Sequence, residues 1–177
     1  KKIGNPPILG WTGTFSSKPY LDSIKPMFYE LRKYLEYKIV FITNFEYELP
    51  GLDLEIIEWS EETEIEDLHK IDIGLYPLTE SPWSLGKGGL KTLQYMAAGI
   101  PTISTDFGTV KNFINHKENG FLVRTKSEWI KAIQEIILND HLREKIIDSA
   151  RQTVEERYSV SANKLKYIEI LNKLIKK

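Results

Sequence analysis

A chain of 177 residues that is 41% hydrophobic can bury one substantial core and is most simply one domain. Its 24 basic and 25 acidic residues give a formal charge of -1, which excludes the strong positive field that recruits nucleic acid or an anionic membrane. The sequence has no cysteine, which excludes disulfides and thiolate metal sites and fits a reducing compartment. Its three histidines lie far apart without ligand spacing, and no apolar run approaches the roughly twenty residues of a membrane helix.

Short apolar runs alternate along the chain with longer stretches of helical period. The pattern predicts, in chain order, strand 7–13, helix 20–35, strand 38–43, strand 52–59, helix 61–71, strand 71–78, helix 88–98, strand 101–105, short helix 110–114, strand 120–123 and helices 127–138, 141–158 and 161–177. Pro26 is expected to delay or kink the first helix. The alternation predicts an α/β fold, a Rossmann-like open parallel sheet flanked by helices, as a single domain over residues 1–177.

The most informative segment, residues 85–104, predicts a glycine-rich loop, a helix and a buried strand in succession. Gly99 is expected to cap the end of the helix, and Pro101 prevents its continuation.

Two common nucleotide motifs are absent from the chain. The glycine-lysine pair at 86–87 lacks the following serine or threonine of a P-loop, and Gly10 and Gly13 match the dinucleotide fingerprint poorly.

The start of this predicted helix has the features of an anion site. Backbone N–H groups there lack intrahelical partners and the helix dipole is positive, so Gly88, Gly89 and Leu90 are predicted to hold a phosphate. Lys87 and Lys91 would add positive charge. The competing explanations are that the glycines permit close packing of helix on sheet, and that Lys91 is an ordinary solvated residue.

Ligands of open parallel sheets bind at the carboxyl edge, which makes the loop after the first strand a second part of the site. The amides and hydroxyls of Thr14 and Ser16 in this loop suit a diphosphate. The alternative is an ordinary serine-rich turn.

Three ordered blocks, residues 72–78, 93–101 and 119–123, resemble the C-terminal, donor-binding domain of retaining GT-B glycosyltransferases of family four. Residues 11–13 and 158–160 are similar to the first strand and the C-terminal helical region of that domain. The resemblance implies a nucleotide-sugar-binding domain, the C-terminal half of a GT-B fold, whose C-terminal helices begin at about residue 141. In this fold an N-terminal domain binds the acceptor, and that domain is expected to be absent from this chain.

Many members of the family have two glutamates eight positions apart, the first on the donor sugar and the second on the ribose. The matching positions here are Gly86 and Gln94. The resemblance implies that the Gln94 amide hydrogen-bonds the ribose hydroxyls, although protein backbone is an alternative partner. Because Gly86 offers only backbone to a donor sugar, Glu80 or Ser84 is expected to substitute for the missing glutamate.

The resemblance also places the nucleobase after the third strand, beside Glu58, Trp59 and Ser60. Trp59 is otherwise explained as a core aromatic residue.

The expected function is transfer of a hexose-type sugar from a nucleoside diphosphate sugar to a glycan or other acceptor, with retention of configuration. No cofactor and no metal is expected, since no Asp-x-Asp motif occurs, and no catalytic residue is assigned. The expected partners are the nucleotide-sugar donor and the missing N-terminal domain, without nucleic acid. A non-catalytic nucleotide-sugar sensor or partner subunit and a GT-B epimerase are the alternatives.

The last helical pattern, residues 161–177, puts Leu165, Ile168, Leu171 and Ile175 on one side and lysines elsewhere. This face is expected to pack on protein, with a membrane surface as the alternative. The expected location is the cytoplasm, with peripheral association of the full-length protein at the inner membrane surface left open.

Overall fold

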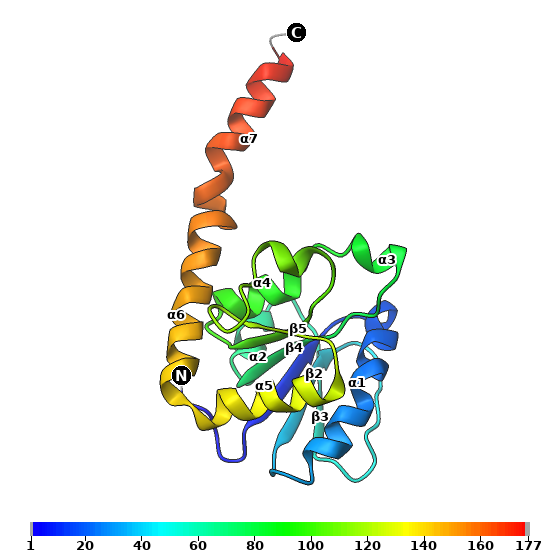
Figure 1. Ribbon diagram of the computed structural model, residues 1–177. Coiled ribbons are helices and arrows are strands. Elements are labelled where there is room, and N and C mark those ends of the chain that lie inside the picture. Colours follow the sequence, from blue (N-terminus) through cyan, green and yellow to red (C-terminus); the bar gives the residue numbers. More distant parts are fainter. Residues whose placement is uncertain (1, 176–177) are drawn as a thin grey trace.

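Six short strands form one parallel sheet in the computed structural model, which describes residues 2–175 (Figure 1). The strands are β1 (Ile8–Thr12), β2 (Lys38–Thr43), β3 (Leu54–Glu58), β4 (Ile73–Tyr76), β5 (Thr102–Thr105) and β6 (Phe121–Val123). Their order across the sheet is β3-β2-β1-β4-β5-β6, and each neighbouring pair is parallel. This arrangement confirms the predicted Rossmann-like open sheet. The strand order reverses between β1 and β4, which is where such sheets bind ligands.

Helices cover both faces of the sheet. They are α1 (Lys18–Leu31), α2 (Glu64–Leu68), α3 (Pro82–Leu85), α4 (Leu90–Ala97), α5 (Lys126–Leu138), α6 (Asp140–Arg157) and α7 (Val160–Ile175). Helices α1 and α5 pack on the face that presents the odd-numbered residues of β1 and β2, among them Leu9 and Phe41. Helices α2 and α4 pack on the opposite face, which presents Val40 and Ile42. The strands are therefore apolar on both faces, as buried parallel strands require.

The predicted strands and the long helices are confirmed, but several details differ. Pro26 lies inside α1 and does not delay it, because the helix already begins at Lys18 with Pro19 in its first turn. The predicted helix 61–71 shortens to α2, and the predicted helix 110–114 is a 3-10 turn, Gly108–Asn112. A further 3-10 turn (Phe15–Ser17) and helix α3 were not predicted, because one turn of helix leaves no periodic pattern. Lys176 and Lys177, at the end of the last predicted helix, lie outside the described residues.

Tyr95 fixes α4 to the sheet beside the end of β1. Its side chain is fully buried, and its hydroxyl accepts a hydrogen bond from the backbone N–H of Thr12 at 2.8 Å. The ring lies directly on β4, where a Cβ on Gly74 would come within 2.6 Å of it. Glycine at this position lets the helix approach the sheet closely. The first turn of α4 is thereby held next to the loop that follows β1.

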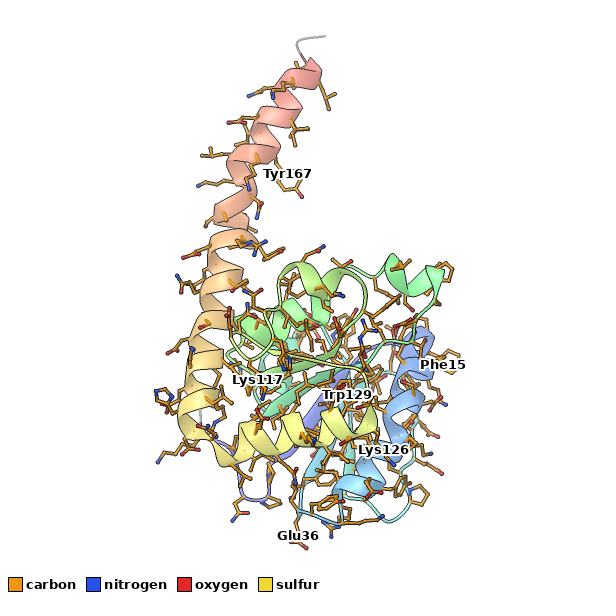
Figure 2. The ribbon with its side chains drawn as sticks, viewed as in Figure 1. Phe15, Glu36, Lys117, Lys126, Trp129 and Tyr167 are labelled. Atoms are coloured by element: carbon orange, nitrogen blue, oxygen red, sulfur yellow. The ribbon has the colours of Figure 1, made fainter. Side chains whose placement is uncertain are left out.

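Helix α6 packs against α4 and α5, whereas α7 continues away from the rest of the molecule (Figure 1). No α7 residue within the described range is buried, and Tyr167 stands clear of the body of the fold (Figure 2). The predicted apolar side of this helix is exposed to solvent, including Leu165, Ile168 and Leu171. Among residues 2–175, no helix has the length and apolar character to cross a membrane.

Candidate functional site

The carboxyl ends of β1 and β4 border a cavity of about 210 Å³ at the point where the strand order reverses. Thr12, Thr14 and Tyr76 line it from these two strands and the loop after β1. Residues 87–91, from the glycine-rich loop and the first turn of α4, line the other side. The fold therefore brings together Thr14 and all five residues that the sequence predicted for phosphate binding in the glycine-rich loop.

The two predicted lysines have different surroundings. The Lys87 ammonium lies 5.7 Å from the centre of the Tyr20 ring and 6.0 Å from that of Trp83, and it forms no ion pair within residues 2–175. The Lys91 ammonium instead pairs with the Glu64 carboxylate at 3.0 Å. Lys87 is thus a cation available to an anionic ligand, whereas the charge of Lys91 is already balanced.

The glycines before α4 also differ from one another. Gly89 has a φ of 71°, and a Cβ there would come within 2.7 Å of Phe113. This left-handed backbone cannot continue a right-handed helix, so α4 begins at Leu90 and not at the predicted Gly88. A Cβ on Gly88 would have no heavy atom within 4 Å. Packing therefore explains why residue 89 is glycine, but it does not explain the glycine at position 88, whose backbone borders the cavity.

The loop after β1 is held by its own hydrogen bonds. Thr14 and Ser16 share a bond between their hydroxyls at 3.0 Å, and the Ser17 N–H donates to the Thr14 carbonyl at 2.8 Å. Thr14 lines the cavity, whereas Ser16 is exposed and does not. Burial raises the pKa of Tyr76 above its ordinary value, so this phenol at the cavity wall is neutral.

Glu64, the first residue of α2, was missed by sequence reasoning. Its carboxylate accepts hydrogen bonds from Trp59 Nε1 at 2.9 Å, Lys91 Nζ at 3.0 Å and Gln94 Nε2 at 3.1 Å. Burial acts to raise the Glu64 pKa, but bonds from these three side chains outweigh it and hold the pKa below the ordinary value. An ionised carboxylate therefore joins the predicted ribose residue, Gln94, to the predicted nucleobase residue, Trp59.

The other residues after β3 lie at the surface. Trp59 is 41% exposed, which contradicts the alternative that it is a core aromatic. Its backbone N–H continues the sheet by donating to the Thr43 carbonyl at 3.2 Å. The Ser60 hydroxyl donates to Glu62 at 2.7 Å, and Glu58 is exposed at the end of its strand.

The residues predicted to contact the donor sugar do not line the 210 Å³ cavity. Ser84 is fully buried, where its hydroxyl donates to the Tyr20 hydroxyl at 3.1 Å and shares a bond with Ser81 at 2.8 Å. Glu80 is exposed and pairs with Arg124 at 3.4 Å. Gly86 ends the short helix α3 at the surface. Ser84 therefore links α1 to α3, and a ligand hydroxyl would have to displace one of its existing bonds.

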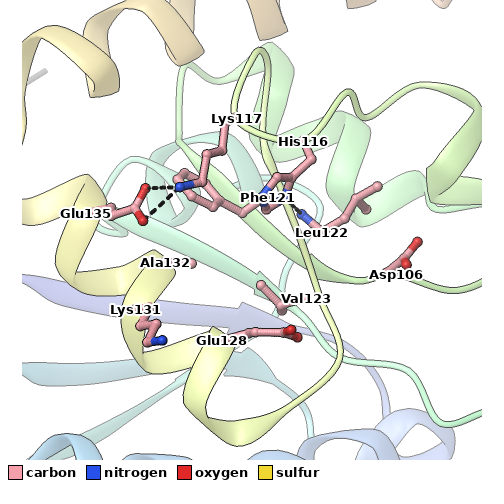
Figure 3. Close-up of a pocket in the computed structure, with 10 residues that line it drawn as sticks. All are labelled: Asp106, His116, Lys117, Phe121, Leu122, Val123, Glu128, Lys131, Ala132 and Glu135. Atoms are coloured by element: carbon pink, nitrogen blue, oxygen red, sulfur yellow. Dashed lines mark hydrogen bonds and ion pairs between the residues drawn. The ribbon is translucent and has the colours of Figure 1, made fainter.

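A second cavity, of about 350 Å³, lies between β6, α5 and residues 115–120 (Figure 3). Most of the charged groups in its walls are engaged in ion pairs or hydrogen bonds. Lys117 pairs with Glu135 at 2.8 Å, and His116 Nδ1 accepts the Leu122 N–H at 3.1 Å. Glu128 completes the capping box that starts α5. Lys131 also lines this cavity and forms no ion pair within residues 2–175. The cavity lies away from the reversal of the strand order and from the start of α4, so we assign the site to the cavity between β1 and β4.

The strand order and the position of the cavity are those of a Rossmann-like domain of the kind that forms one half of a GT-B glycosyltransferase. Residues 32–153 match the family described as glycosyl transferases group 1. The match covers more than half of the chain, and the chain belongs to this family.

Solved structures have the same fold. The C-terminal domain of the glycosyl transferase group 1 family protein LpcC from Francisella tularensis gives a TM-score of 0.67 at 21% identity, over 90% of this chain and 89% of that chain. A glycosyltransferase from Rickettsia africae ESF-5 gives a TM-score of 0.78 at 20% identity, over 98% of this chain and 49% of that chain. Anabaena Alr3699/HepE, solved in complex with UDP-glucose, gives a TM-score of 0.73 at 14% identity, over 94% of this chain and 48% of that chain. This chain thus spans about half of the two longer proteins. No curated protein matches its sequence.

Proposed function

We propose that this chain binds a nucleoside diphosphate sugar and provides the donor half of a glycosyltransferase. The complete enzyme would transfer a hexose-type sugar, with retention of configuration, to a glycan or another acceptor bound by an N-terminal domain. The observation that carries the proposal is the cavity at the switch point of the sheet. Lys87, which forms no ion pair with any described residue, the open backbone at Gly88 and the start of α4 all border it.

These groups suit the diphosphate of the donor. The N–H groups that open α4 have no intrahelical partner, and the helix dipole makes this end positive. Lys87 adds a full charge without a competing carboxylate within residues 2–175. When the bond from the sugar to the diphosphate breaks, negative charge develops on the departing phosphate, and preorganised donors at that position lower the barrier. We propose no metal or other cofactor for this step.

The first test is a calorimetric and thermal-shift screen of the chain against UDP, GDP and ADP and their common sugars. UDP is the first candidate, because the similar Anabaena protein was solved with UDP-glucose. We expect one nucleotide to bind clearly more tightly than the others and, at 100 times its dissociation constant, to raise the stability by about 2.7 kcal/mol. Failure of all three nucleotides to bind at millimolar concentration would contradict the proposal.

The two glycines before α4 provide a matched pair of variants. Gly88→Ala is expected to leave the free energy of unfolding within about 0.5 kcal/mol of the wild type, because the added methyl meets no protein atom. It should weaken nucleoside diphosphate binding about tenfold or more, because the methyl keeps the phosphate from the backbone. Gly89→Ala is expected to destabilise the fold by about 1–3 kcal/mol through its left-handed backbone and contact with Phe113.

Thermal unfolding and titration calorimetry measure these two effects separately. Wild-type affinity in a stably folded Gly88→Ala chain would show that the diphosphate does not approach this backbone.

A further inference from the structure

A third cavity, of about 540 Å³, lies at the carboxyl edge of the sheet on the side covered by α1 and α5. Its walls come from α1, from the ends of β4, β5 and β6 and from the first turns of α5, and they include Met27, Leu78, Thr105, Arg124, Lys126 and Trp129. Of the described residues that line this cavity and the 210 Å³ cavity, Leu78 alone is common to both. The two cavities are therefore neighbours with separate polar groups.

Trp129 brings an unused hydrogen-bond donor to this cavity. The residue is 3% exposed, and its indole N–H has no hydrogen-bond partner within residues 2–175. The indole nitrogen is nevertheless not among the fully enclosed polar atoms of the described chain, so it opens to the space that Trp129 borders, which is this cavity. Buried indole N–H groups usually have a partner, and one without a partner is costly. A ligand in the cavity with an acceptor oxygen would provide that partner.

Lys126, the first residue of α5, brings a positive charge to the same cavity. Figure 2 shows Lys126 and Trp129 at the end of α5 that lies next to α1. The Lys126 ammonium is 3.9 Å from a Glu30 oxygen that already accepts a hydrogen bond from Lys33 at 3.0 Å. The positive end of the α5 dipole lies at the same place. The charge of Lys126 is therefore only weakly balanced and is available to an anion.

The other charged residues of the wall belong to a balanced cluster. Arg124 pairs with Asp106 at 2.8 Å and with Glu80 at 3.4 Å, and Asp106 pairs in turn with Lys111 at 3.3 Å. Two cations and two carboxylates thus neutralise one another. The excess charge at this cavity is consequently positive, and it comes from Lys126 and the start of α5.

Two threonines add hydroxyl groups to the wall. The Thr105 oxygen accepts the Leu78 N–H at 2.9 Å, which leaves the hydroxyl hydrogen of Thr105 to be donated. The Thr79 hydroxyl has no hydrogen-bond partner within the described part of the chain. Together with Trp129 and Lys126, four side chains can donate to a ligand. A phosphate group, with three strong acceptor oxygens and nearly two negative charges, uses more of these donors than a carboxylate does.

The cavity has room for more than a phosphate group. A volume of about 540 Å³ lies in the range of sites that bind small organic molecules. The buried side chains of Ile24, Met27 and Leu78 form its apolar part, and Ser23 and Thr79 add hydroxyls. A sugar ring matches this lining, because it presents both an apolar C–H face and hydroxyl groups.

We propose that this third cavity binds a sugar phosphate. The phosphate oxygens accept hydrogen bonds from the indole N–H of Trp129 and from the ammonium of Lys126, and the sugar ring packs on Met27 and Leu78. The inference goes beyond the proposed function, because none of these polar groups belongs to the proposed nucleotide site.

The first test is titration calorimetry of the 177-residue chain with glucose 6-phosphate, glucose and inorganic phosphate. We expect glucose 6-phosphate to bind at least about tenfold more tightly than either of the others, because it alone fills both the polar and the apolar part of the cavity. Equal affinity for glucose 6-phosphate and inorganic phosphate would overturn the inference. Failure of glucose 6-phosphate to bind at millimolar concentration would overturn it as well.

Two lysine variants and a competitor locate the bound phosphate. Lys126→Gln removes a half-exposed charge and should weaken glucose 6-phosphate binding about tenfold. Lys131→Gln makes the same change farther along α5, in the wall of the 350 Å³ cavity, and should leave this affinity unchanged. Saturating UDP should change the wild-type affinity less than about threefold. Equal affinities of the two variants, or displacement of glucose 6-phosphate by UDP, would show that the phosphate binds elsewhere.

The indole N–H of Trp129 reports on the contact directly. Its ¹H–¹⁵N NMR signal, assigned by its loss in Trp129→Phe, should move to higher ¹H frequency when glucose 6-phosphate binds, because the N–H gains a charged acceptor. Glucose at the same concentration should leave the signal in place. A signal that stays unchanged at saturation with glucose 6-phosphate would rule out contact between Trp129 and the phosphate.

Discussion

Replacing Lys87 with alanine is expected to weaken nucleoside diphosphate binding about tenfold or more, while leaving the weaker binding of the corresponding nucleoside nearly unchanged. The reason is the electrostatic position of this lysine. Its ammonium lies at the cavity over two aromatic rings and forms no ion pair within residues 2–175. Its charge is therefore available to a phosphate without first breaking a salt bridge.

Two further lysine variants make the measurement specific. Lys131→Ala removes the same charge from α5, in the wall of the 350 Å³ cavity, and should leave nucleotide affinity unchanged. Lys91→Ala should weaken nucleoside diphosphate binding less than Lys87→Ala does, because the charge of Lys91 is already balanced by Glu64. Calorimetric titration measures the affinity of all three variants for the nucleoside and for the nucleoside diphosphate. If Lys87→Ala reduces nucleoside and nucleoside diphosphate affinity equally, the lysine does not contact the phosphates.

The second large effect concerns transfer of the sugar. This 177-residue chain alone is expected to bind the donor and to transfer no sugar, since it spans 49% of the Rickettsia glycosyltransferase that it resembles. Orientation of the two reactants contributes on the order of 7–11 kcal/mol in well-arranged systems, and it requires the surface that holds the acceptor. Exclusion of water from the cavity requires the same surface.

Release and transfer of radiolabelled sugar are measured against a broad panel of acceptors. The comparison is the longer protein that is expected to contain this chain together with an acceptor domain. Steady formation of glycosylated product by the 177-residue chain would contradict the proposed division of labour. A longer protein that binds the donor and transfers nothing would favour the nucleotide-sugar sensor.

The fold was largely predictable because its signals are local. Apolar runs of four to eight residues mark buried strands, and the glycine-rich segment followed by Gly99 and Pro101 marks both ends of α4 within two residues. The place of Lys87 and Gly88 just before α4 was predictable for the same reason, because consecutive residues determine where a helix starts.

The parts of the site that were missed depend on contacts between distant residues. Glu64 is 27 residues from Lys91 and 30 from Gln94 in the sequence. It is one of several acidic residues at the start of a predicted helix, and the favourable interaction of acids with the helix dipole is a sufficient explanation for all of them. Ser84 stands in a polar loop, and its burial depends on Tyr20, 64 residues away. Periodicity contains no information about such partners.

Helix α7 is exposed along its length, so its local stability as a helix is separate from the folding stability of the sheet and its packed helices. Because no described residue of α7 is buried, unwinding this helix exposes none of the core on either face of the sheet. Its amide protons should therefore exchange with solvent through local opening, long before those of the strands, which require global unfolding. Sixteen residues are close to the length at which an isolated helix is marginal in water, so α7 is expected to be only marginally stable as a helix while it is exposed. Substitutions along α7 are accordingly expected to leave the folding free energy of the sheet and the shape of the cavity between β1 and β4 unchanged.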